Sequence, residues 1–309
     1  MDANSLIEII KESMPVVHSS ISAIVGATIT TLFLRSNTKT TEFEKIKAGH
    51  FKEVIDSLLK HGKMSYYEYH KANNFLEIAK LADKMDNGYS EGNSENTADY
   101  DFDWFIRFFD SASNISNEKM QELWAAVLAG KVKKRGLFSF RTLDVLHSMS
   151  QEEAVIFEQF SVMILDYSMI LTSFGMVGES LNESYGFDND ALRLLEEIGI
   201  LNGLLVDHST VLEVGESMGF ESGGSILLLS SNLNEPVDIE FKGFKLTMAG
   251  VQLCGLVQQQ EKSFGYLYDL GKEIKERFPQ LKVTLHSING VEGEHILYDD
   301  TIDLLIEQS

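Results

Sequence analysis

Apolar residues recur at helical spacing along the first part of the chain. Between residues 43 and 59 they lie three and four positions apart, and the pattern ends near Gly62. Ser65 and Glu68 then have the spacing of a capping box, which predicts a second helix through Met85. The two segments predict a helical hairpin within residues 1–86. Residues 87–98 are rich in Gly, Ser and Asn, which predicts a polar linker and a domain boundary.

A second helical domain is predicted over residues 99–178. It opens with an aromatic-rich segment that is typical of a helix buried on one face, and Ser116 is the expected cap of the next helix. Ser139 begins a short helix. Ser150 and Glu153 form another capping box, followed by an almost continuously apolar segment that predicts one helix to about Phe174.

The pattern changes after Gly178, and residues 179–309 predict an α+β domain. A helix ending at Gly199 precedes β-type runs, and three of these predict strands at residues 211–214, 225–230 and 237–246. Thr247 is placed to cap an apolar helix over residues 248–260. A helix from Phe264 to Phe278 and an alternating strand over residues 281–288 follow. The fold class is therefore mainly α with a C-terminal α+β part.

One N-terminal segment has the length of a membrane-spanning helix. Residues 13–34 are 22 consecutive uncharged positions, and the excess of Lys and Arg after them would leave the bulk of the protein in the cytoplasm, anchored to the inner membrane. Ser and Thr dilute the segment. At helical spacing its apolar positions form one stripe, which includes Val17, Ile21, Ile24, Val25 and Leu32. A membrane span, a buried or oligomerising helix, and surface attachment all fit this pattern.

Charge and cysteine content limit the classes of function. The formal net charge of -21 disfavours a general nucleic-acid-binding surface, because neutralising phosphates requires clustered cations. The single Cys254 rules out an intramolecular disulfide and lies between apolar neighbours, which predicts an inert buried thiol in a reducing compartment.

The segment over residues 116–160 resembles a family of bacterial proteins known as domain of unknown function 2806. The positions that carry the resemblance are Ser116, Trp124, Leu128, Ala129, Ser139, Arg141, Thr142, Leu143, Ser150, Glu153, Ala154 and Phe157. The turn departs from the pattern, since it reads Lys134-Arg135-Gly136 without proline, and Lys131 stands where an acidic residue is commoner.

Further along the chain, "LLEEIGIL" followed by "FKLTMAGVQLCGLV" is similar to the helix and LT-x-x-G-x-x-L pairing of that family and of winged-helix-like modules. The resemblance implies a genomic context near anti-phage and mobile-element genes, but no chemistry. The predicted recognition helix, residues 248–260, has no Lys or Arg, which is more typical of a packing helix than of a groove reader.

A cationic cluster beside the signature is the main candidate for a ligand or partner contact. Its members are Lys131, Lys133, Lys134, Arg135 and Arg141. They could bind an anion or a partner, but cations after a helix C-terminus also complement the helix dipole without any ligand. For Arg141 a forked hydrogen bond to helix carbonyls or to Glu122 is a structural alternative.

Motifs for catalysis and cofactors are weak. Gly215–Gly219 reads G-x-S-x-G, with Ser217 as a candidate nucleophile and His286 or His295 as its base, although a Gly-rich loop explains the same letters. Asp99–Asp103 evokes a calcium loop but lacks the required Gly and Glu, so a solvated helix start is preferred. The histidines have no zinc-ligand spacing, and no cofactor is expected.

The sequence thus predicts a non-enzymatic bacterial interaction or assembly protein in anti-phage defence or a stress response. The partners expected are further copies of the chain or another protein, with a membrane contact through residues 13–34 as an option. A nucleic-acid-binding regulator and a hydrolase using Gly215–Gly219 are the alternatives.

Overall fold

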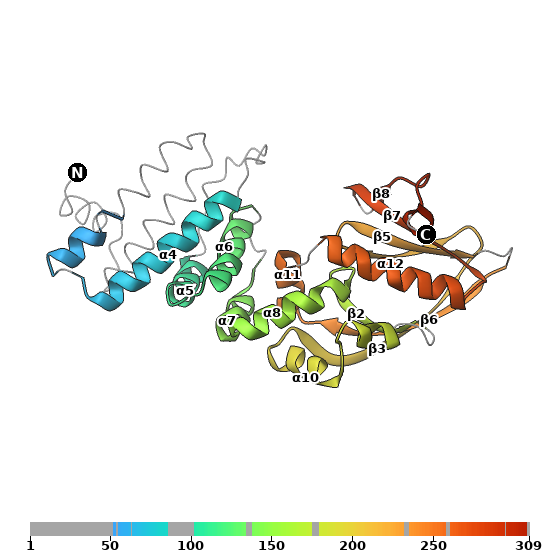
Figure 1. Cartoon of the computed structure of the whole chain (residues 1–309), viewed down its shortest axis with the longest axis horizontal. Helices are drawn as coiled ribbons and strands as arrows, with labels where there is room; N and C mark the ends of the chain where they lie inside the picture. The colour runs from blue at the N-terminus through green and yellow to red at the C-terminus, as the bar shows by residue number, and fades with distance from the viewer. Residues whose placement is uncertain are drawn as a thin grey trace. The chain divides into compact units, whose positions relative to one another are not determined.

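The computed structural model describes the chain in segments: residues 52–53, 55–62, 64–85, 102–133, 138–174, 179–231, 235–257, 260–293 and 295–307. The chain divides into two compact units, Met1–His147 and Ser148–Ser309 (Figure 1). The apolar stripe of residues 13–34, the predicted linker 87–98, Lys134 and Arg135 lie outside the described residues. The finer division predicted from the sequence therefore stays a prediction.

The described part of unit 1 is helical. Its helices are α4 (Tyr66–Met85), α5 (Phe102–Ala112), α6 (Glu118–Lys133) and α7 (Phe140–Ser148), and residues 55–60 are also helical. The capping box before α4 is confirmed, because Glu68 N–H donates to Ser65 Oγ at 3.2 Å and Ser65 N–H donates to Glu68 Oε2 at 3.0 Å. The two helices of the predicted hairpin are thus present where the structure describes them.

Aromatic rings form the core of unit 1. The Phe75 ring on α4 makes an edge contact with Phe109 at 4.8 Å between centroids, while Phe108 packs edge-on against Trp124 at 5.3 Å. Trp124 is 0% exposed, and its indole N–H has no hydrogen-bond partner among the described residues. The tryptophan of the family signature therefore contributes through packing.

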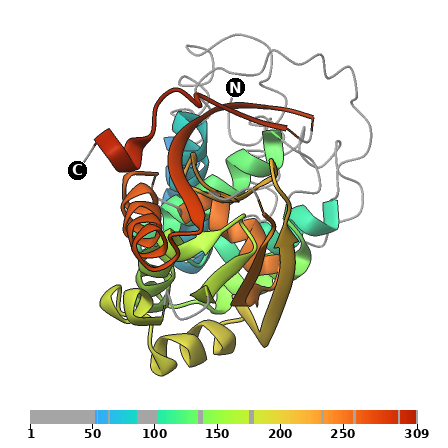
Figure 2. The ribbon, with the colours of Figure 1, turned by 90° about the vertical axis from the view of Figure 1, so that its right-hand side faces the viewer.

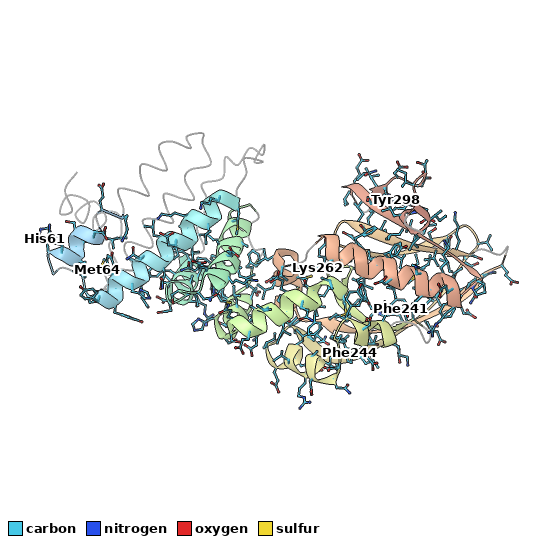
Figure 3. All side chains as sticks on the ribbon, in the orientation of Figure 1. His61, Met64, Phe241, Phe244, Lys262 and Tyr298 are labelled. Carbon is cyan, nitrogen blue, oxygen red and sulfur yellow. The ribbon has the colours of Figure 1, made fainter. Side chains whose placement is uncertain are left out.

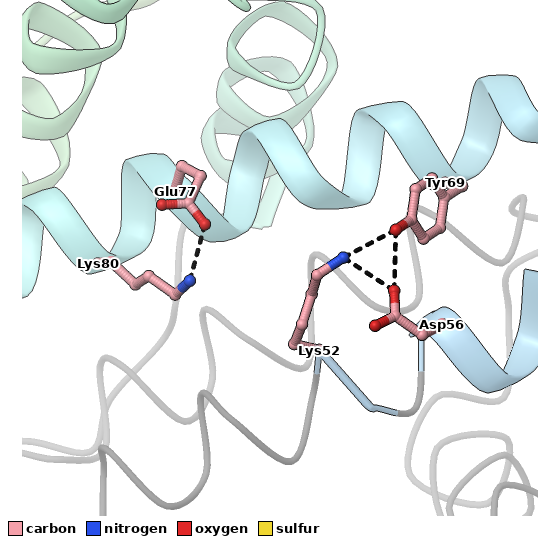
Figure 4. A network of polar contacts seen from close by, with 5 residues as sticks. All are labelled: Lys52, Asp56, Tyr69, Glu77 and Lys80. Atoms are coloured by element: carbon pink, nitrogen blue, oxygen red, sulfur yellow. Dashed lines mark hydrogen bonds and ion pairs between the residues drawn. The ribbon is translucent and has the colours of Figure 1, made fainter.

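A polar network fastens the N-terminal helical segment to α4 (Figure 4). Lys52 Nζ lies 2.8 Å from both Asp56 Oδ1 and Tyr69 Oη, and Tyr69 Oη donates to the same Asp56 oxygen at 2.8 Å. The hydrogen bonds from Lys52 and Tyr69 lower the pKa of the Asp56 carboxyl. All three side chains are partly exposed, so these hydrogen bonds join the two helical segments at the protein surface.

Two predicted details of the signature change in the structure. The cap of α6 is Asn117 rather than Ser116, because Asn117 Oδ1 accepts the Met120 N–H at 3.1 Å. The arginine whose contacts join two helices is Arg107 on α5, and not the predicted Arg141 on α7. Its guanidinium lies 5.4 Å from the centroid of the Phe140 ring and its Nε is 3.5 Å from Asp144 Oδ1 on α7.

Unit 2 begins with a helix that is shorter than the sequence predicted. The capping box of Ser150 and Glu153 is confirmed, but α8 (Gln151–Phe160) ends at Phe160. A short 3-10 helix η1 (Ser161–Met163) and strands β1 (Ile164–Leu165) and β2 (Met169–Phe174) follow. The prediction of a helix to Phe174 is wrong, because this apolar segment is buried by pairing in a sheet instead.

The first sheet of unit 2 is antiparallel, with strand order β1-β2-β6-β3. Its long strands are β3 (Leu201–Leu212) and β6 (Val237–Leu246), while α9 (Glu179–Ser184) and α10 (Asn189–Glu197) lie between β2 and β3 in the chain. The predicted strand 237–246 is confirmed, whereas the short run at 211–214 is the end of a strand that starts ten residues earlier, at Leu201. Phe241 and Phe244 of β6 are labelled in Figure 3.

The second sheet has the antiparallel order β4-β5-β7-β8. It consists of β4 (Ser217–Ser222), β5 (Ser225–Ser231), β7 (Leu281–Glu292) and β8 (His295–Tyr298). The helix α12 (Gln260–Arg277) packs against β5 and β7, as Figure 2 shows in orange beside the red strand. The remaining helices are α11 (Met248–Val257), which precedes α12, and α13 (Leu304–Glu307), which is the last described element. The protein is therefore a mixed α and β structure with its sheets in the C-terminal unit.

Candidate interaction surface

Most of the cationic residues predicted from the sequence have side chains that lie outside the described part of the chain. Lys131 and Lys133 lie in the last turn of α6, but their side chains are outside the described part. Arg141 is exposed in the first turn of α7, and neither a hydrogen bond nor an ion pair links it to another described residue. The predicted contact of Arg141 with Glu122 is absent among these residues. The anion or partner contact stays a prediction.

The G-x-S-x-G segment is a turn followed by a strand. Gly215 has φ +88 in the turn after β3, and Ser217 begins β4, where it is exposed. A nucleophile elbow requires the serine between a strand and a helix. His286 on β7 lies opposite Ile226 on β5, and Ile226 lies opposite Glu221 on β4. Glu221 is four residues along β4 from Ser217, so His286 and Ser217 are about 13 Å apart along the strand direction alone. These positions do not form a serine–histidine pair.

His286 and Cys254 are both buried, and the two ring nitrogens of His286 are hydrogen-bonded. His286 is buried on β7, with Nδ1 2.9 Å from the Asp299 carbonyl oxygen and Nε2 2.9 Å from Thr284 Oγ1. Cys254 is 0% exposed on α11, and burial raises the pKa of its thiol to about 12. A thiol with this pKa stays protonated near neutral pH, as the sequence predicted for an inert cysteine.

The similarity to the LT-x-x-G-x-x-L pattern has a structural explanation. Thr247 Oγ1 accepts the Gly250 N–H at 3.0 Å, which caps α11, and donates to the Gly199 carbonyl at 2.6 Å. Gly199 has φ +77 just after α10, and Thr247 N–H donates to Ile200 O at 2.8 Å. A Cβ at Gly250 would lie 2.4 Å from Ile200 O. The motif therefore locks the end of α10 to the start of α11.

An acid and tyrosine cluster joins the two sheets of unit 2. Asp166 and Tyr167 form the turn between β1 and β2 with φ of 51 and 52, a left-handed conformation that is uncommon for residues other than glycine. Asp166 N–H donates to Glu221 O at 2.8 Å, and Glu221 N–H donates to Asp166 Oδ1 at 2.8 Å. Burial raises the pKa of both carboxyls and of the Tyr167 hydroxyl, which donates to the Glu221 carboxylate. These bonds tie β1 and β2 to β4.

A more exposed surface is formed by α10 and β3, which we call the α10–β3 surface. Its apolar members on β3 are Leu204, 66% exposed, Leu205, 52% exposed, and Val211, 48% exposed. The helix approaches the strand closely where the Glu196 side chain lies over Gly203, since a Cβ on Gly203 would be 2.7 Å from Glu196 Oε1. Exposed aliphatic side chains beside a helix are a common feature of surfaces that bind protein.

The charge on this surface is acidic. Asp188 caps α10 by accepting the N–H groups of Asp190 and Ala191, at 3.0 and 2.9 Å. Arg193, the single basic residue of α10, is paired with Asp190 at 2.6 Å. Glu196 and Glu197 remain exposed at the other end of the helix, and neither is joined to a cation within the described part of the chain. The surface therefore repels a polyanion.

Sequence reasoning missed this surface for two reasons. The helix was recognised from its apolar positions and its end at Gly199, but the exposed leucines belong to a part of β3 that has no clear alternation. The local pattern around residues 248–260 pointed instead to α11, which buries Ala249, Leu253 and Val257 and is a packing helix, as expected.

The described residues contain neither a cluster of metal ligands nor a membrane-spanning helix. Within these segments no group of three or more His, Cys, Asp or Glu side chains could hold a metal ion. No helix in the same segments is both long and apolar enough to cross a bilayer. The apolar stripe from Val17 to Leu32 lies outside them, so its membrane or assembly role stays a prediction.

Comparison with known proteins identifies a family. Residues 62–270 match the family described as "Protein of unknown function (DUF2806)", a match that extends over both compact units. No curated protein and no solved structure matches the chain. The matched segment contains the signature around Trp124 and Arg141 as well as the Thr247 and Gly250 lock. Because the match spans more than half of the 309 residues, the chain belongs to the DUF2806 family.

Proposed function

We propose that this chain is a non-enzymatic bacterial interaction or assembly protein, acting in anti-phage defence or another stress response, and that unit 2 binds protein through the α10–β3 surface. The observation that carries the proposal is the exposure of Leu204, Leu205 and Val211 on a strand beside an acidic helix. The cellular context is an expectation from the family resemblance. Attachment or assembly through residues 13–34 is a further part of the proposal.

The connectivity of unit 2 supports a winged-helix-like module. The order α8, β2, α9, α10, β3, β6, with β6 lying between β2 and β3 in the sheet, is the helix, strand, helix, helix, strand, strand order of a winged helix. In this reading β3 and β6 form the wing, and α10 occupies the position of the recognition helix. The strands β4 and β5 are an insertion at the tip of the wing.

Protein is a better ligand than nucleic acid for a module with these charges. A recognition helix presents its N-terminal residues to base edges, and DNA-binding affinity depends on cations that neutralise phosphates. Here the N-terminus of α10 carries Asp188 and Asp190, and its one arginine is paired within the helix. A nucleic-acid-binding regulator is nevertheless the alternative function, because the connectivity is shared with DNA-binding proteins.

A site-specific photocrosslinking experiment tests the proposal. A photoreactive phenylalanine at Leu204 of the full chain, expressed in its host, is expected to form covalent adducts with protein. The control is the same residue at Val291, an aliphatic position on β7 that is 62% exposed, compared with 66% at Leu204. Adduct formation at both positions alike would contradict a specific surface.

The same samples distinguish the alternative. Adducts that are lost after nuclease treatment would favour the nucleic-acid-binding regulator. In that case binding to DNA or RNA should weaken steeply with salt. It should also fall when Lys131, Lys133, Lys134 and Arg135 are neutralised together. Neither effect is expected for a module that binds protein through α10 and β3.

A further inference from the structure

The strand β3 is the edge of the first sheet and has a long unpaired side. In the described sheet order it is the last strand, hydrogen-bonded to β6 alone. From Leu205 to Leu212 every residue is in uninterrupted register with β6, after an irregularity confined to the segment between Leu201 and Leu205. In an antiparallel pair every second residue points its N–H and C=O away from the partner strand, so four of these eight residues present regular backbone groups on the side away from β6.

This edge lacks the features that usually prevent strand pairing. Proteins protect edges with Lys, Pro, bulges or inward-pointing charges. The segment from Leu205 to Leu212 contains no Lys, Arg or Pro, and its one ionised residue, Asp207, is already paired with Lys242 on β6 at 3.2 Å. Its exposed aliphatic side chains, Leu205 and Val211, would be covered by another strand.

We infer that β3 pairs with β3 of a second copy of this chain, in antiparallel register centred on His208, so that the first sheets of two copies become one. This inference names the partner for the α10–β3 surface and rests on the proposed function. Pairing of exposed strand edges is an established mode of protein recognition, in which the main chain supplies hydrogen bonds and the side chains supply specificity.

Symmetry restricts the register. The two-fold axis that relates two antiparallel edge strands runs perpendicular to the sheet, so residues that face each other must lie on the same face of it. The axis must therefore pass midway between one residue of β3 and the same residue of the second copy. Centring on Asp207 would place two carboxylates opposite each other, and centring on Val206 would place Leu205 opposite Asp207. Both arrangements are unfavourable.

Centring on His208 gives complementary pairs. Leu205, 52% exposed, then faces Val211 of the second copy, 48% exposed, and the symmetry repeats this apolar pair. Asp207 faces Ser209, whose hydroxyl can donate to the carboxylate. Shifting the centre to Ser209 instead would oppose Asp207 to Val211. On the face of the sheet that carries Leu205 and Val211, the His208 register is thus the one that pairs apolar with apolar and polar with polar. On the other face it places Val206 opposite Thr210.

The His208 side chain is positioned for this arrangement. Its ring stacks on Phe241 of β6 at 4.8 Å between centroids and an interplanar angle of 16°. The ring is therefore held against its own sheet, and Cα of His208 lies next to the axis. In an antiparallel pair opposite Cα atoms are about 4.5–5.5 Å apart, within the range of a disulfide.

Cysteine crosslinking of the full-length chain tests both the partner and the register. His208→Cys is expected to form an intermolecular disulfide under mild oxidation, giving a covalent dimer on a non-reducing gel. Thr210→Cys is the matched control. Its position would be about 13 Å from its symmetry mate, beyond disulfide reach. The native Cys254 is buried, so it adds little background.

A measurement of mass in solution complements the crosslink. Light scattering after size exclusion should show two copies for the native chain and one for the Leu205→Lys/Val211→Lys variant, in which lysines would face each other. Val291→Lys changes an aliphatic residue on the other sheet that is more exposed, at 62%, and should leave the mass unchanged. Circular dichroism should show that all variants are folded.

Two outcomes would overturn the inference without touching the proposed function. A native dimer in which Thr210→Cys crosslinks as readily as His208→Cys would mean that the copies meet elsewhere. A native monomer whose photoreactive Leu204 derivative still captures a different protein would mean that β3 binds that protein instead. Loss of specific adducts at Leu204, in contrast, would contradict the proposed function itself.

Discussion

Two glycines of α11 lie in different surroundings although they are five positions apart in one helix. Gly250 faces the backbone of Ile200 so closely that a Cβ would lie 2.4 Å from its carbonyl oxygen, whereas a Cβ at Gly255 would have no atom within 4 Å. The close approach at Gly250 belongs to the lock that Thr247 forms with the end of α10. The glycine of the LT-x-x-G motif is therefore required by packing.

We expect Gly250→Ala to lower the free energy of unfolding by about 1–3 kcal/mol, because the added methyl group displaces a carbonyl that the backbone holds in place. Gly255→Ala is the matched control and should raise the free energy of unfolding by up to about 1 kcal/mol, since alanine favours the helix. Chemical denaturation followed by circular dichroism measures both. Equal midpoints for the two variants would contradict the lock.

The Asp166 carboxyl predicts a dependence of stability on pH. Burial raises its pKa above the ordinary value of 3.8, so the folded chain keeps a proton that the unfolded chain releases at lower pH. The free energy of unfolding then decreases as the pH rises from about 4 through the folded pKa. Asp166→Asn keeps an acceptor oxygen for the Glu221 N–H and removes the charge.

Asp166→Asn should therefore be more stable than the native chain by an amount that grows as the pH rises through this window. Thermal unfolding at several pH values measures the difference. A difference that stays constant with pH would show that the gain comes from asparagine's tolerance of the left-handed conformation at φ 51 and not from the carboxyl.

At the scale of elements, helix starts follow local chemistry. Ser65 and Ser150 each begin a Ser-x-x-Glu sequence, and both form the reciprocal hydrogen bonds of a capping box. These bonds satisfy N–H groups that no turn of helix can reach. The starts of α4 and α8 were accordingly predictable from four residues each.

Removing the cap of α8 should weaken unit 2 by a modest amount. We expect Ser150→Ala to lower the free energy of unfolding by about 1 kcal/mol, because the Glu153 N–H loses its acceptor. Ser150→Asp supplies another acceptor and should restore most of the loss. A denaturant titration of the three proteins checks this. An unchanged midpoint for Ser150→Ala would mean that packing alone holds the start of α8.

The segment after α8 shows where local patterns mislead. Residues 161–174 are apolar enough for a buried helix or for buried strands, and periodicity does not separate the two. Asp166 and Tyr167, both at positive φ, form the turn that reverses the chain. The turn contains no glycine, the residue that usually indicates a turn of this kind in a sequence. Pairing of β2 with β6, about seventy residues later in the chain, decides the outcome.

At the scale of the whole molecule, the arrangement of strands creates the surface that we propose as functional. The sheet order places β6 between β2 and β3 and leaves β3 at the edge. The exposed leucines of β3 and the acidic α10 come together through this order and through the contact of Glu196 with Gly203. A pairing of two β3 strands would extend the same sheet across a two-fold axis.

Local sequence was sufficient for the helix caps at Ser65, Ser139 and Ser150, for the strand over residues 237–246, and for the family signature, because each depends on neighbours within a few residues. Strand order, the length of β3 and the identity of its exposed edge depended on the tertiary structure. Their hydrogen bonds join segments far apart in the chain, and such pairings leave no periodic trace in either segment.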